Sequence, residues 1–116
     1  MALLPNLSTA QGLDPHKLLQ KEPTDTWPTY NGDYSGRRFS PLTQIEIANV
    51  RHLSLAWMYR VKIAGGAMRG VGEPDIKSTP LMVNGVLYFT IPDHVYALDA
   101  RTGAELWHYE IGRAHV

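Results

Sequence analysis

The chain has 116 residues, and its 11 Lys and Arg side chains balance 11 Asp and Glu side chains. This length allows one domain of ordinary size, and the net charge of zero offers no basic surface for nucleic acid or anionic lipid. Cysteine is absent, which excludes a disulfide, a thiolate metal site and a c-type haem attachment within these residues. No apolar run approaches the roughly 18–20 residues that span a bilayer, so no transmembrane segment is expected.

Residues 1–26 predict an N-terminal extension. The apolar and small residues within positions 1–11 are typical of the end of a signal peptide, and a flexible apolar terminus explains them equally well. Asp14 is a favourable N-cap and Pro15 a favourable first-turn residue, so a short helix is expected over residues 15–21. The following Pro23 ends this helix.

Residues 27–76 contain one predicted strand between two loops. Tyr, Gly, Asp, Ser and Arg dominate residues 27–41 and indicate an ordered loop, while residues 41–50 have room for a short turn of helix. Residues 53–61 alternate between apolar and other side chains with a period of two, which predicts a strand. Residues 62–76 are rich in Gly and predict a second loop.

The last third of the chain predicts four short strands with tight connections. Asn84-Gly85 between two apolar runs is a strong signal for a two-residue hairpin, because both turn residues need a positive φ. The segment Pro92-Asp93-His94 is expected to form the next turn, and Asp99 to Gly103 a longer one. The strands are expected at residues 79–83, 86–90, 95–99 and 105–111, which together form an antiparallel meander.

The apolar pattern of this meander predicts that it is packed on both faces. Leu81-Met82-Val83 and Val86-Leu87-Tyr88-Phe89 place apolar side chains on both sides of the pleat, whereas an antiparallel sheet with one wet face alternates cleanly. A blade of a β-propeller, which lies between its neighbours, meets this condition.

An internal repeat supports a propeller. Trp57 to Val61 and Trp107 to Ile111 share the pattern Trp-x-Tyr-x-aliphatic, and their spacing suits a four-stranded blade. Both tryptophans are therefore expected on outermost strands of successive blades. The sequence predicts an all-β fold: a partial β-propeller with one four-stranded antiparallel blade, the closing strand of the last blade, and an irregular N-terminal extension.

The segment from residue 97 to residue 107 closely resembles the tryptophan docking motif of quinoprotein propellers, A-x-D-x-x-T-G-K-x-x-W. The matching residues are Ala97, Asp99, Thr102, Gly103 and Trp107, while Ala104 replaces the usual Lys. In such a motif Asp and Thr tie the turn, Gly supplies a positive φ, and Trp packs against the adjacent blade. These five residues are expected to have structural roles.

Residues 27–42 look like the first segment of PQQ-dependent alcohol and related dehydrogenases, and the likeness extends to about Tyr109. The resemblance implies an exported, generally periplasmic, eight-bladed enzyme that binds pyrroloquinoline quinone (PQQ) with a calcium or lanthanide ion on the propeller axis. It also implies oxidation of an alcohol or sugar by transfer of two electrons to the quinone, and a separate electron acceptor. Residues 27–110 are thus expected to be the start of such a propeller.

One cofactor position of the family falls inside this chain. A Glu that contacts the quinone in the family corresponds to Lys77 in the stretch Ile76-Lys77-Ser78-Thr79-Pro80. An ammonium group can pair with the carboxylates of the quinone, whereas a solvated loop position is the commoner state of Lys. No catalytic residue and no metal ligand is expected, because the other functional positions of the family lie beyond Val116 and the five His residues are scattered. The chain by itself is expected to bind no cofactor.

The docking motif also fits a non-catalytic propeller scaffold, such as an outer-membrane assembly lipoprotein. The segment at residues 27–42 favours the enzyme, and the absence of cysteine leaves no residue for lipid attachment. Residues 111–116 resemble a translated sequencing-adapter read and are expected to be a non-native tail. The sequence therefore predicts an inactive N-terminal fragment of a PQQ-dependent dehydrogenase, with the scaffold as the alternative.

Overall fold

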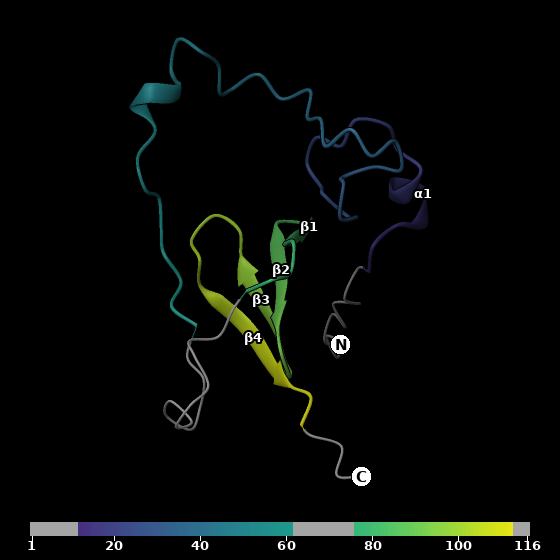
Figure 1. Ribbon diagram of the computed structural model, residues 1–116, viewed down its shortest axis with the longest axis vertical. Coiled ribbons are helices and arrows are strands. Elements are labelled where there is room, and N and C mark those ends of the chain that lie inside the picture. Colours follow the sequence, from purple (N-terminus) through teal and green to yellow (C-terminus); the bar gives the residue numbers. More distant parts are fainter. Residues whose placement is uncertain (1–11, 62–75, 113–116) are drawn as a thin grey trace, which may run out of the picture.

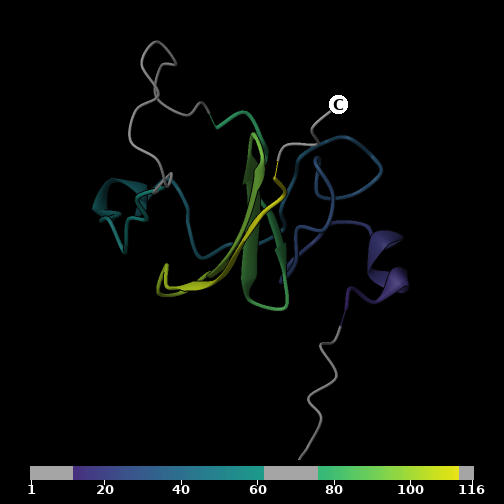
Figure 2. The same cartoon turned by 90° about the horizontal axis from the view of Figure 1, so that it is seen from below.

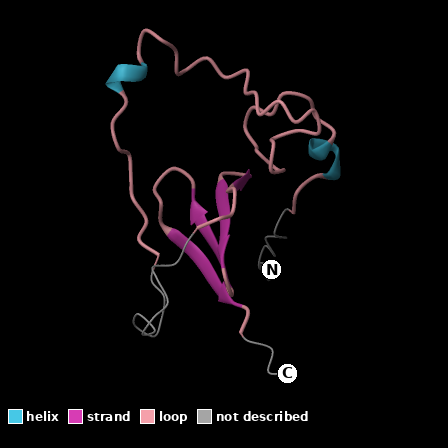
Figure 3. Cartoon of the chain, viewed as in Figure 1, coloured by secondary structure: helices cyan, strands magenta, loops and turns pink. Residues whose placement is uncertain are grey.

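One four-stranded antiparallel sheet forms the centre of the protein, and very little helix surrounds it (Figures 1 and 3). The structure is a computed structural model that describes residues 12–61 and 76–112. The predicted signal-peptide remnant, most of the predicted loop at residues 62–76 and residues 113–116 of the predicted tail lie outside these ranges. The elements, in chain order, are α1 (Pro15–Leu18), η1 (Val50–His52), β1 (Leu81–Val83), β2 (Val86–Ile91), β3 (His94–Asp99) and β4 (Glu105–Glu110).

The strands follow one another in the sheet in the order β1-β2-β3-β4, which confirms the predicted meander. Asn84 and Gly85 both have a positive φ, of 51° and 76°, as a two-residue hairpin turn of the primed type requires. The second turn is shorter than predicted. His94 pairs with Ile91 and begins β3, so only Pro92 and Asp93 connect the strands, and Asp93 supplies the positive φ.

The core lies on one face of the sheet. Tyr96 and Leu98 of β3 are each 1% exposed, and the ring of Tyr96 stacks on Phe89 of β2 at 4.9 Å between centroids. The remaining buried member of this cluster is Ile91. Since side chains alternate across a strand, every second residue of β2 and β3 contributes to this face.

Residues 53–61 cover that core without forming a strand. The predicted strand is wrong in this respect, as is the placement of Trp57 on the outermost strand of a sheet, whereas Trp107 does lie on the outermost strand β4. A strand needs a neighbouring backbone with which to exchange hydrogen bonds, and none of the described residues offers one to this segment. Trp57, Tyr59 and Val61 instead pack across the face of the sheet against the core cluster.

The helical predictions are partly correct. Asp14 caps α1 by accepting a hydrogen bond from the backbone N–H of His16 at 3.0 Å, as expected, but the helix has four residues and buries none of them. The turn of helix expected within residues 41–50 forms only at their end, where the Val50 N–H donates to the Glu46 carbonyl at 2.9 Å and η1 begins. The Asn49 side chain binds the backbone N–H of Glu46 and the carbonyl of Gln44, and this local bonding stabilises a turn in place of a helix.

The N-terminal loop reaches the free edge of β1. Trp27 exchanges two backbone hydrogen bonds with Met82, of 2.7 and 3.0 Å, and its ring lies over Gly32. The Asp33 carboxylate accepts from the backbone N–H groups of Glu22 and Ser35, so Asp33 acts as a turn residue. Figure 2 shows this loop and α1 on one side of the sheet and η1 on the other.

Candidate functional site

The turn between β3 and β4 is held by the side chains of its own residues. Oδ1 of Asp99 accepts hydrogen bonds from the backbone N–H groups of Arg101 and Thr102, each at 2.9 Å, and the Thr102 hydroxyl accepts from the N–H of Ala104 at 3.2 Å. The hydrogen bonds that Asp99 accepts hold its pKa below the usual value, and the one from the Thr102 N–H has the largest effect. Gly103 has a φ of 70°, which is the left-handed region that favours glycine.

Trp57 lies directly on this turn. A Cβ atom built on Gly103 would lie 2.4 and 2.5 Å from two carbons of the Trp57 indole, far inside van der Waals contact. The indole N–H also donates to the backbone carbonyl of Ala100 at 3.2 Å, across 43 residues of sequence. Glycine is therefore required at position 103 for two reasons, the backbone conformation and the space for the ring.

Ala97 and Trp107, the outer members of the motif, face each other across β3 and β4. Their Cα atoms are partners in the ladder, Ala97 is fully buried, and the ring of Trp107 lies 6.0 Å from that of Tyr88. Because Ala97 and Trp107 occupy alternate positions to Tyr96 and His108, they lie on the face opposite the core. Trp107 keeps 46% of its surface exposed.

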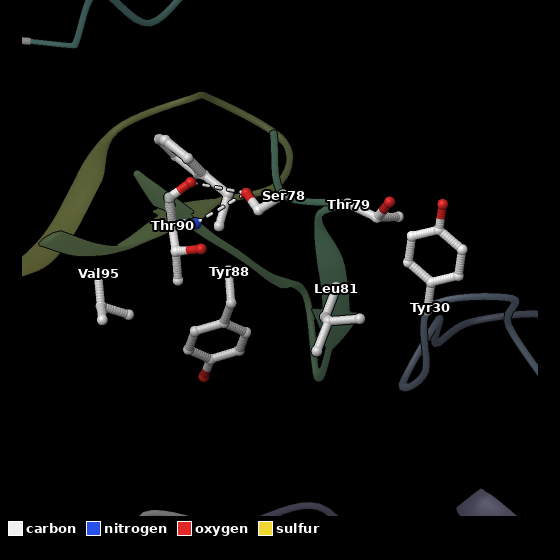
Figure 4. A pocket seen from close by; sticks show the side chains of 8 residues that line it. Tyr30, Ser78, Thr79, Leu81, Tyr88, Thr90 and Val95 are labelled. Atoms are coloured by element: carbon white, nitrogen blue, oxygen red, sulfur yellow. Dashed lines mark hydrogen bonds between the residues drawn. The ribbon is translucent and has the colours of Figure 1, made fainter. Parts of the chain in front are cut away.

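Lys77 lies just before β1, and the next residue is held firmly. The Ser78 hydroxyl donates to the carbonyl of Thr90 at 2.7 Å and accepts from its N–H at 3.0 Å (Figure 4). This double hydrogen bond ties the segment before the first strand to the end of β2. Lys77 itself is exposed in the segment before β1, and its place follows from the position of Ser78.

A pocket of about 300 Å³ lies next to this segment. Figure 4 shows Leu81, Tyr88 and Val95 pointing to the same side of the sheet, with Tyr30 of the N-terminal loop beside Thr79. The guanidinium carbon of Arg38 lies 4.4 Å from the centre of the Tyr30 ring. Hydrogen bonds with Arg38 and Thr79 lower the pKa of the Tyr30 phenol, and the bond with Arg38 has the larger effect. The lining residues are Tyr30, Ser78, Thr79, Leu81, Tyr88, Phe89, Thr90 and Val95.

The described residues hold no assembled catalytic or metal-binding group. Within residues 12–61 and 76–112, no three His, Asp or Glu side chains come close enough to hold a metal ion. No helix in the described part of the chain is long and apolar enough to cross a membrane. The arrangement fixes the turn between β3 and β4, packs Trp57 on that turn, and places Lys77 in the segment before β1.

Sequence reasoning missed the partners of three aromatic residues. The repeat identified Trp57 but did not predict that it contacts Gly103 of the next unit. It also did not predict the pairing of Trp27 with β1 or the contact of Tyr30 with Arg38. The spacing of the repeat was the one available signal, because a tryptophan that docks on the following turn must recur with the period of the blade.

Comparison with known proteins gives consistent matches. Residues 27–115 match the family model described as PQQ, glucose/ethanol/alcohol dehydrogenase, beta-propeller domain. The quinohemoprotein alcohol dehydrogenase of Comamonas testosteroni is 38% identical over 88 residues, which are 75% of this chain and 11% of that protein. The quinoprotein glucose dehydrogenase of Escherichia coli K12 is 40% identical over 88 residues, or 72% of this chain and 11% of that protein.

Solved structures agree with these matches. The quinohemoprotein alcohol dehydrogenase ADHIIG of Pseudomonas putida HK5 superposes with a TM-score of 0.69 at 37% identity, over 84% of this chain and 13% of that one. The Comamonas testosteroni enzyme gives a TM-score of 0.60 at 36% identity, over 74% of this chain and 12% of that one. The chain thus spans about a tenth of the length of these relatives. It belongs to the family of the PQQ glucose, ethanol and alcohol dehydrogenase β-propeller domains.

Proposed function

We propose that this chain is the N-terminal part of a PQQ-dependent dehydrogenase that oxidises alcohols or sugars, and that it has no dehydrogenase activity by itself. The observation that carries the proposal is the family match over residues 27–115, which includes both the blade and the N-terminal loop that pairs with it. The names of the relatives cover alcohol and glucose dehydrogenases. The substrate of the parent protein is accordingly proposed as a class, alcohols or sugars.

The proposed inactivity follows from the architecture. One blade and one covering segment cannot enclose an axial cavity, and the described residues supply no set of three metal ligands. The calcium or lanthanide ion of the parent would therefore need ligands from outside the described part of this chain. The test is dye-linked oxidation of ethanol and glucose by the purified chain with added PQQ and calcium. Turnover above that of a boiled control would refute the proposed inactivity.

Lys77 is our candidate for contact with the quinone in the parent. It is exposed in the segment before β1, and Ser78 anchors that segment to β2. The quinone supplies the two-electron chemistry when bound. The ammonium group of Lys77 would pair with a carboxylate of the quinone and orient it, and such charge-assisted pairs are about twice as strong as neutral hydrogen bonds.

This role is testable by cofactor binding in the full-length parent. Lys77→Ala is expected to weaken PQQ binding, measured by quenching of tryptophan fluorescence, while Lys21→Ala, which removes an exposed cation of the N-terminal extension, leaves it unchanged. Equal affinities for both variants would exclude Lys77 from the quinone site and leave the family assignment intact.

Two further parts of the proposal concern the whole parent protein. We propose that it is exported to the periplasm, which fractionation of cells expressing the full-length protein would test. The alternative function, a non-catalytic propeller scaffold, shares the docking turn of residues 97–107. Quinone binding by the parent separates the two functions, because a scaffold has no reason to bind PQQ.

A further inference from the structure

Two histidines of neighbouring strands are hydrogen-bonded to each other. Nδ1 of His94 on β3 lies 2.8 Å from Nε2 of His108 on β4, and the two ring centroids are 5.0 Å apart. His94 is 7% exposed, whereas His108 is an exposed residue of the edge strand. His108 also stacks on Tyr96 at 4.3 Å with an interplanar angle of 5°. The pair thus joins the end of β4 to the buried part of β3.

The chemistry of imidazole limits how many protons this contact tolerates. A neutral ring has one N–H donor and one bare nitrogen acceptor, whereas a protonated ring has two donors and no acceptor. A contact of 2.8 Å between two ring nitrogens therefore needs one nitrogen with a proton and one without. The pair holds together when both rings are neutral or when one is charged. With both rings protonated, two N–H groups and two positive charges face each other.

The titratable groups around the two histidines do not change how many protons the hydrogen-bonded pair can hold. Glu110 of β4 is the ladder partner of His94. Tyr96 of β3 lies under His108, and burial raises the pKa of its phenol, so it stays neutral over the range in which histidine titrates. From the covering segment, Tyr59 contacts Tyr96, and its hydroxyl donates to Glu105 of β4.

We propose that His94 and His108 form a pH-sensitive clasp that holds the end of β4 to β3 and opens when the second ring is protonated. His108 is the ring that leaves, because it is on the exposed edge strand while His94 is almost fully buried. Opening removes the stacking on Tyr96 and frees the end of the strand that carries Trp107. This clasp is independent of the function proposed above, since it uses only contacts within the blade.

The expected effect on stability follows from proton linkage. In the unfolded chain each ring takes up a proton near the ordinary histidine pKa of about 6.5. A folded pair that kept one proton, against two in the unfolded chain, would raise the unfolding constant about 30-fold between pH 7.5 and pH 5.0. Because the clasp opens without unfolding the chain, this factor is the upper limit of the effect. The sign is fixed, because the unfolded state binds more protons and stability falls as the pH falls.

Urea unfolding of the full 116-residue chain at these two pH values tests the clasp. His108→Gln keeps a side-chain donor and acceptor but cannot take up a proton, so its unfolding constant should rise less between the two pH values than that of the wild type. The control His16→Gln, at an exposed residue of α1, should behave as the wild type does. Equal pH dependence in the wild type and His108→Gln would overturn the proposal.

Side-chain 15N spectra of the same chain provide a second measurement that does not depend on a substitution. At pH 7.5 one ring N–H should show the correlation to a nitrogen of the other ring that a hydrogen bond produces, and the correlation should vanish on acidification to pH 5.0. Two rings that titrate independently, or a chain that shows no such correlation at pH 7.5, would equally refute the clasp.

Discussion

Replacing Gly103 with alanine should destabilise the protein far more than the same change at Gly85. Both glycines have a positive φ, of 70° and 76°, so each substitution carries the left-handed penalty of about 1–2 kcal/mol. At Gly85 the new methyl group meets nothing within 4 Å, whereas at Gly103 it would lie 2.4 Å from the Trp57 ring. The two substitutions therefore share the backbone cost and differ in the clash with the indole.

The extra cost at Gly103 is the cost of displacing Trp57. The ring must move by about 1 Å or more to restore ordinary contact, which breaks its hydrogen bond to the Ala100 carbonyl, worth about 0.5–1.5 kcal/mol. Part of the burial of the ring is also lost, and full burial of a large apolar side chain is worth about 1.5–3 kcal/mol. We expect Gly103→Ala to cost about 3–5 kcal/mol in total and Gly85→Ala about 1–2 kcal/mol.

Urea unfolding monitored by tryptophan fluorescence measures both values. In a Trp57→Ala background, where the ring is gone, the two glycine substitutions should cost the same, because only the backbone penalty remains. A Gly103→Ala protein as stable as Gly85→Ala, with Trp57 present, would show that the indole does not pack on this turn.

Three further outcomes follow from individual contacts. Asp99→Ala should lower the urea midpoint at pH 7, and the difference from wild type should vanish as the pH falls, because the depressed pKa of Asp99 makes its contribution present above about pH 3.9 and lost on protonation. Ser78→Ala should cost about 1 kcal/mol and speed amide exchange at Thr90, whose N–H and carbonyl both lose a partner; unchanged exchange would contradict this. The pKa of Tyr59 is raised, first by burial and then by Glu105, so its stabilising effect is present below about pH 10 and lost as the pH rises through the raised value. Absorbance at alkaline pH should show delayed ionisation of Tyr59 and of the buried Tyr96, and Tyr59→Phe should reduce the delayed absorbance change by the share of one tyrosine.

Local interactions explain which predictions were correct. The hairpin at Asn84 and Gly85, the cap of α1 by Asp14 and the four strands all depend on contacts between residues that are close in sequence. The bonds of Asp99 and Thr102 within their turn are of the same kind. Such turns and caps can be predicted from a sequence because only a few residue types form them.

The errors have a different origin. The alternation at residues 53–61 correctly placed Trp57, Tyr59 and Val61 on one face that packs on the core, whereas Leu53 and Leu55, predicted for the same face, are exposed. It could not reveal whether a neighbouring strand exists to pair with that backbone. The helical turn expected within residues 41–50 forms only at their end, where Val50 bonds to Glu46 and begins η1.

The sequence by itself thus determined the meander, its turns, the period of the repeat and the family, because each of these depends on short-range residue patterns. Only the tertiary structure decided that Trp57 fills the space above Gly103, that Ser78 anchors the segment of Lys77, and that His94 and His108 share a hydrogen bond. These contacts join residues whose distance in space is set by the twist and register of the whole sheet. No local propensity encodes that distance, so the partners of these side chains became visible only once the sheet had brought them together.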